Sequence, residues 1–70
     1  MKYAIEWFSL ESRTTTKELN TETLEKAKII FNDECLKLRM SSENDQKKYI
    51  ILLSQTDEND VYGELDSFSV

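Results

Sequence analysis

Few side chains in this sequence have the reactivity and the neighbours that catalysis needs. It has one cysteine, Cys35, and no histidine, so a cysteine nucleophile would lack the imidazole base that commonly activates it. The serines at 54, 67 and 69 are not part of the glycine-flanked turn that exposes a serine nucleophile. A chain with a single glycine cannot build a glycine-rich loop around a phosphate group.

Carboxylates are the one abundant reactive group, because 14 of the 70 residues are Asp or Glu. With so many acids, pairs suited to acid–base chemistry arise from composition alone and say nothing about catalysis. A domain of this size has a thin core, which leaves little room for a dry cleft that could shift a carboxyl pKa. We therefore interpret the protein as a non-enzyme that uses no cofactor.

The acidic run 57–64 has the composition of a calcium loop but not its spacing. Asp57 and Asn59 match the first and third ligand positions. Val61 stands where a further oxygen ligand is needed, and Tyr62 stands where the loop requires glycine. Without histidine and with one cysteine, an ordinary zinc site is not expected either. We predict a solvated hairpin turn and no metal site.

The net charge of −5 is confined to the end of the chain. Residues 1–53 contain nine basic and nine acidic side chains, whereas residues 54–70 contain five acids and no base. A negative field repels phosphate, so direct binding to nucleic acid or to an anionic membrane is not expected. The same field favours a basic protein surface as the partner.

The lone thiol, without a disulfide framework, favours a reducing compartment, and we expect a cytoplasmic protein. The longest apolar run, 49–53, is far shorter than the ~20 residues that cross a bilayer. The start of the chain, 1–6, contains an acid and does not match a signal peptide. Residues 1–70 are expected to form one small domain.

Period-two spacing of apolar residues predicts a first strand at 2–10, with Tyr3, Ile5 and Trp7 on one face. Three consecutive threonines favour a short second strand at 14–19, a weaker signal. Asn20-Thr21 would cap a helix running from about residue 22 to 39 or 40. The remaining expected elements are a polar loop at 41–46, an interior strand at 47–55, a hairpin turn at 57–60 and a last strand at 61–70. This order predicts an α+β fold, β-(β)-α-β-β, with an antiparallel-rich sheet of three or four strands and one helix packed on one face.

The predicted helix is apolar on two opposite faces. The face expected to cover the sheet consists of Leu24, Ala27, Phe31, Cys35 and Leu38, with Ile30 at its edge. Ile29, Leu36 and Met40 align on the other side. This second face is a homodimer or partner contact, or else it is shielded by residues 12–19 or consists of ordinary exposed aliphatics.

In the last strand, regular alternation would place aromatic and acidic side chains on one face. Aromatic side chains supply contact area and acids steer a basic partner, as at protein interfaces. The candidate partner-binding residues are Asp57, Glu58, Asp60, Tyr62, Glu64, Asp66 and Phe68. The alternative is a solubilising strand face on which Glu64 and Asp66 guard a sheet edge.

Three functions are compatible with these features. The leading hypothesis is a small acidic protein-interaction module, an inhibitor or adaptor, that presents its acidic C-terminal hairpin to a basic surface of a protein partner. The second is a structural homo-oligomer joined through Ile29, Leu36 and Met40, and the third is a small ligand-binding regulatory domain. In general character the chain is similar to small acidic accessory proteins of phages and mobile elements, some of which block nucleases by mimicking the charge of DNA.

Overall fold

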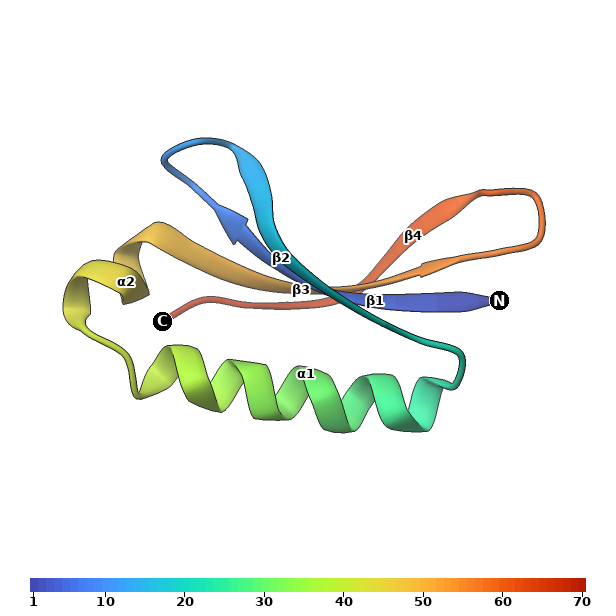
Figure 1. Cartoon of the computed structure of the whole chain (residues 1–70), viewed down its shortest axis with the longest axis horizontal. Coiled ribbons are helices and arrows are strands. Elements are labelled where there is room, and N and C mark those ends of the chain that lie inside the picture. Colours follow the sequence, from blue (N-terminus) through green and yellow to red (C-terminus); the bar gives the residue numbers. More distant parts are fainter.

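Two β-hairpins supply all four strands of one antiparallel sheet (Figure 1). The computed structural model describes residues 1–70. Its elements are β1 (Lys2–Ser9), β2 (Thr14–Thr21), α1 (Leu24–Arg39), α2 (Glu43–Lys48), β3 (Tyr49–Thr56) and β4 (Tyr62–Phe68). The strand order is β2-β1-β3-β4, so β1 and β3 are interior strands and β2 and β4 are edges. The predicted α+β class and the second strand are confirmed, and the sheet has four strands.

The core lies between α1 and the two interior strands, because alternate residues of each strand face the helix. The first strand follows its predicted pattern, with Ile5 fully buried between Tyr3 and Trp7, which pack against the core. The predicted helix face is confirmed at its centre, while Cys35 is half-buried and Leu24 is exposed. The buried apolar residues are Ile5, Ala27, Phe31, Leu38, Ile51 and Leu53.

Helix α1 begins later than predicted because β2 is longer than predicted. Asn20 and Thr21 are not caps, since they pair with β1 as the last two residues of the second strand. The cap is Thr23, whose side-chain oxygen accepts a hydrogen bond from the backbone N–H of Lys26 at 3.3 Å. Pairing with β1 keeps residues 20 and 21 in the strand, so the helix starts only after the chain has turned.

The predicted polar loop at 41–46 is wrong, because most of it belongs to the short helix α2. Ser42 is its N-cap and accepts a hydrogen bond from the N–H of Asp45 at 3.2 Å. The Gln46 amide donates to the carbonyl oxygen of Arg39 at 2.6 Å, which ties α2 to the end of α1. Strand β3 therefore begins at Tyr49 and not at residue 47.

A β-bulge at Leu65 divides β4 into two halves. Leu53 pairs with Asp66, but its neighbour Ser54 pairs with Glu64, so Leu65 has no partner on β3. The extra residue reverses the alternation of side chains along the strand. The prediction that the even-numbered residues from 62 to 70 share one face is therefore wrong, and β4 ends at Phe68.

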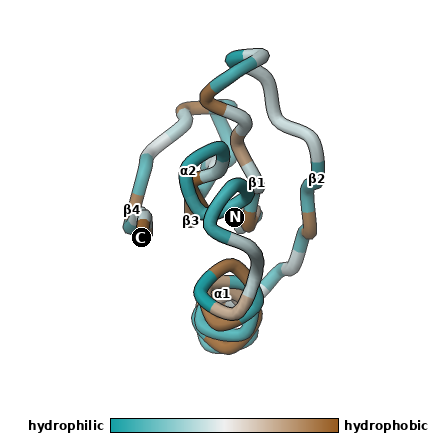
Figure 2. Tube along the Cα trace, turned by 90° about the vertical axis from the view of Figure 1, so that its left-hand side faces the viewer, coloured by the Kyte–Doolittle hydropathy of each residue, from teal (hydrophilic) through white to brown (hydrophobic).

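Helix α1 covers one face of the sheet and leaves the other face open. Both hairpin turns rise from the sheet on the side away from α1, so the open face lies between two raised ends (Figure 1). An end-on view shows β2 and β4 on either side of β1 and β3, with α1 beneath them (Figure 2). Neither helix is long and apolar enough to cross a membrane.

Candidate functional site

The open face of the sheet carries apolar side chains that no element covers. Because Ile5 points into the core, its neighbours at even positions of β1 point to the open side. Ala4 and Phe8 lie there, together with Ile50 and Leu52 of β3, and all four are half-buried. These four side chains form an apolar strip on the face of the sheet that α1 does not cover.

Two carboxylates face each other on the same side of the sheet. Glu6 of β1 is the direct cross-strand partner of Glu18 of β2. Partial burial raises the pKa of Glu6 above its usual value, and hydrogen bonding to Glu18 and the negative charge of Glu18 raise it further. Like charges placed directly opposite one another destabilise a strand pair, so this pair lowers the stability of the free protein.

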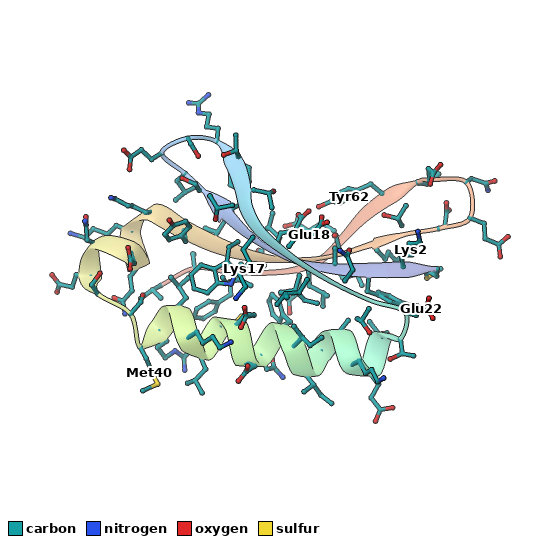
Figure 3. All side chains as sticks on the ribbon, in the orientation of Figure 1. Lys2, Lys17, Glu18, Glu22, Met40 and Tyr62 are labelled. Atoms are coloured by element: carbon teal, nitrogen blue, oxygen red, sulfur yellow. The ribbon has the colours of Figure 1, made fainter.

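The carboxylate pair lines a pocket of about 300 Å³ on the open face. The pocket is built by all four strands and the β3–β4 turn, from Lys2, Tyr3, Ala4, Glu6, Glu18, Asn20, Ser54, Thr56, Asp60 and Tyr62. Figure 3 shows Glu18 and Tyr62 above the sheet, on the side opposite α1. The three carboxylates and one ammonium group of the lining give a formal charge of −2.

Ser54 lies at the floor of this pocket with an unused hydroxyl group. Its neighbour Leu53 packs into the core, so the Ser54 side chain points to the open face, where it lines the pocket. The residue is only 2% exposed, and none of the side-chain hydrogen bonds of the chain involves its hydroxyl. Every fully enclosed polar side-chain atom has a partner, so the Ser54 oxygen still opens onto the pocket.

The predicted acids at 57 and 58 lie outside the pocket, in the β3–β4 turn. The Asp57 carboxylate accepts hydrogen bonds from the N–H groups of Asn59 at 2.8 Å and Val61 at 2.9 Å. Asp57 therefore stabilises the turn that was predicted here. Glu58 is exposed and makes no ion pair, so it adds only long-range charge.

The bulge distributes the other predicted partner-binding residues between two surfaces. Asp60 and Tyr62 line the pocket, and Glu64 follows them on the same face. Asp66 instead lines a groove of about 380 Å³ between α1 and β4, and Phe68 packs against the core. The structure thus brings Asp60, Tyr62 and Glu64 together with Glu6 and Glu18, which the sequence analysis did not single out.

The second apolar face of α1 lies on the side away from the sheet. Ile29, Leu36 and Met40 are 64%, 51% and 78% exposed. Met40 projects from the end of α1 into solvent (Figure 3). The alternative that residues 12–19 shield this face is therefore wrong, because that segment pairs with β1 instead.

A buried carboxylate that the sequence analysis missed joins β1, β2 and α1. Glu34 is 1% exposed, and one of its oxygens accepts hydrogen bonds from Lys17 Nζ at 2.9 Å and Trp7 Nε1 at 3.3 Å. Its other oxygen lies 2.8 Å from Lys37 Nζ. Only Lys37, three residues further along the helix, could have signalled this cluster, because the other two partners come from distant strands.

The Glu34 cluster is structural and leaves no free base. Burial raises the pKa of the Glu34 carboxyl, but hydrogen bonds from Lys37 and Lys17, with their charges, outweigh burial and hold it below the usual value of 4.5. The carboxylate is thus ionised and occupied by three donors. Its contacts with Trp7 and Lys17 hold the β1–β2 hairpin against α1.

The Cys35 thiol is protonated at neutral pH. Burial raises its pKa to about 11, and the charge of Asp66 adds to the effect. No group of three or more acidic or cysteine side chains is placed to hold a metal ion.

Replacing Glu6 with glutamine is expected to raise the free energy of unfolding at pH 7 by about 0.5 kcal/mol, because it removes the repulsion from Glu18. A raised pKa means that the folded state binds this proton more tightly than the unfolded state. The contribution of Glu6 is thus complete below pH 4.5 and is lost as the pH rises through the folded pKa. Urea unfolding at pH 4 and pH 7 measures both effects, with the exposed Glu58→Gln as control.

The fold and the pocket define a small α+β domain whose sheet presents an uncovered acidic and apolar face. No protein-family model, curated protein or solved structure matches the chain. Its function is therefore inferred from its own residues.

Proposed function

We propose that this chain is a small protein-interaction module, an inhibitor or adaptor, that binds a basic surface of a protein partner. The contact surface is the open face of the sheet together with the adjoining β3–β4 hairpin. The observation that supports this proposal is the open face itself, where half-buried apolar residues on the interior strands lie beside Glu6, Glu18 and Glu64. A cytoplasmic location belongs to the same proposal.

The two parts of the open face have complementary roles in this proposal. Phe8, Ile50 and Leu52 supply apolar area, whose removal from water is worth about 25 cal/mol per Å². The acids around the pocket and along the hairpin steer a basic surface toward this strip and orient it. Such binding weakens as salt is added, because the exposed charges are screened.

Glu64 and Asp66 provide a matched pair of variants to test the proposal. They stand two residues apart on β4, but the bulge places Glu64 beside the pocket and Asp66 on the α1 side. We expect Glu64→Lys to weaken capture of a salt-sensitive basic partner at least tenfold, and Asp66→Lys to leave it nearly unchanged. The measurement is quantitative capture from an extract of the source cell by each immobilised variant, at low and high salt.

The proposal is wrong if both variants retain the partner equally, or if capture is indifferent to salt. Equal loss with both variants would point to the total charge of the chain and not to the open face. Circular dichroism of each variant verifies that the fold is intact.

The second candidate function is a homo-oligomer joined through α1. It is supported by the exposure of Ile29, Leu36 and Met40 in a domain that buries only nine residues. We expect, in that case, a light-scattering mass of two chains at high micromolar concentration and of one chain for Leu36→Lys. A mass of one chain for the wild type at that concentration excludes this function.

A further inference from the structure

We infer that the open-face pocket is a receptor for one guanidinium group, which an arginine of the basic partner inserts when it docks. The inference rests on the proposed function for the identity of the partner. The pocket can be tested without that partner, because its lining belongs entirely to this chain.

The charge and size of the pocket select a cationic head group. Glu6 and Glu18 repel each other across the β1–β2 pair, and a cation between them would turn this repulsion into attraction. Asp60 adds a third carboxylate at the rim. A volume of about 300 Å³ lies at the lower end of the range of ligand pockets and accommodates the end of one side chain.

The chain does not neutralise the pocket with its own cation. Lys2 is part of the lining, but it makes no ion pair within 4.0 Å of any carboxylate. Lys2 is also exposed, so its ammonium group stays hydrated. The carboxylates of the pocket are therefore available to a cation from outside.

The hydroxyl of Ser54 is the second, independent sign of a ligand. This side chain is almost completely buried, opens onto the pocket and makes no hydrogen bond within the chain. Because this hydroxyl opens onto the pocket and has no partner in the chain, a donor from a ligand can hydrogen-bond to it. A guanidinium has five N–H donors in one plane, so it can reach the carboxylates and this hydroxyl together.

Arginine fits the lining better than a metal ion or lysine. A divalent ion requires more oxygen ligands than two facing carboxylates supply, and no group of three acids lies close enough to hold one. Tyr62 lines the pocket and offers an aromatic face, on which a guanidinium stacks more effectively than an ammonium group.

The test is an NMR titration of the ¹⁵N-labelled chain with N-acetyl-arginine amide at constant ionic strength. N-acetyl-citrulline amide, which has the same shape without the charge, is the control ligand. We expect saturable shifts in the millimolar range at the amides of Glu6, Glu18, Ser54 and Tyr62, and none with citrulline. Glu18→Gln should lower the affinity for N-acetyl-arginine amide at least tenfold, whereas Glu58→Gln should leave this affinity unchanged.

Several results would overturn the pocket assignment. These are the absence of saturable shifts, equal shifts with citrulline, unchanged affinity in Glu18→Gln, or identical shifts with magnesium chloride at the same ionic strength. The Glu18→Gln variant should fold, because it removes a like-charge contact.

The two proposals fail separately. If the arginine ligand does not bind but partner capture still depends on Glu64, the pocket assignment is wrong and the interaction function stands. If the ligand binds and capture is indifferent to Glu64→Lys, the pocket stands and the interaction function is wrong.

Discussion

Replacing Leu38 with alanine is expected to lower the free energy of unfolding by about 3 kcal/mol. The Leu38 side chain is completely buried, so its loss removes apolar contact and leaves a cavity. A domain of 70 residues has a total stability of roughly 4–10 kcal/mol. One substitution would therefore remove a large part of what holds this fold together, since no disulfide supports it.

Leu36→Ala is the matched control for Leu38→Ala, because it removes the same atoms from the same helix. Leu36 is half exposed, and its truncation should cost less than about 0.5 kcal/mol. Thermal and urea unfolding at pH 7 measure the difference between the two variants. The midpoint of thermal unfolding of Leu38→Ala should lie more than about 10 °C below that of the wild type. Equal effects of the two variants would mean that α1 packs with a different face on the sheet.

Replacing Glu34 with alanine is expected to cost about 2 kcal/mol. The change leaves the indole N–H of Trp7 without an acceptor and separates the Lys17 and Lys37 ammonium groups from their shared counter-ion. Both lysines are about half exposed, so water compensates them in part, which keeps the cost below that of a fully buried pair.

Asp33→Ala is the control for Glu34→Ala, because Asp33 contacts the same lysine at 3.6 Å from an exposed position. Its effect should stay below about 0.5 kcal/mol. Equal losses in the two variants, measured by urea unfolding at pH 7, would show that burial of Glu34 contributes nothing.

The dependence on pH provides a second test of Glu34. Its folded pKa lies below the usual 4.5, so its contribution is complete above pH 4.5 and is lost as the pH falls through the folded pKa. The variant Glu34→Gln should therefore lose less stability than the wild type between pH 5 and pH 3. Acid titrations of both proteins followed by circular dichroism give this comparison, in which Glu6 acts in the opposite direction.

The sequence was sufficient to predict the elements that carry a strong apolar period. The alternation around Ile5 and the spacing of Ala27, Phe31 and Leu38 gave the faces that meet in the core. The weak strand at 14–19 also exists and extends to Thr21. These patterns are decided by burial, which acts on every second residue of a strand and every third or fourth residue of a helix.

Apolar periodicity could not predict elements that contain no apolar residues. All six residues of α2 are polar, so its only signals were the cap at Ser42, the acids Glu43 and Asp45 in the first turn, and the bases Lys47 and Lys48 in the last turn. The cap of α1 was misplaced because Thr21 and Thr23 are chemically the same, and only pairing with β1 decides between them. A local sequence pattern contains no information about such long-range pairing.

The candidate site was predicted in part, and the missing part depends on strand register. Tyr62 and Glu64 were found from composition, but the place of Tyr62 in one pocket with Glu18 follows from a strand order that the sequence cannot give. Glu34 of α1 was missed for a similar reason, since its partners Trp7 and Lys17 come from the β1–β2 hairpin. That these residues bind a partner remains a prediction.

The bulge at Leu65 makes the last strand unusually sensitive to changes in length. Residues before the bulge, such as Tyr62, lie on the open face, whereas Phe68 beyond it packs against the core. Deleting Leu65 would restore regular alternation along β4. The side chains of one half of the strand would then move from the α1 side of the sheet to the open face, or the reverse. At this position, point substitutions should be tolerated, whereas insertions and deletions should be eliminated by selection.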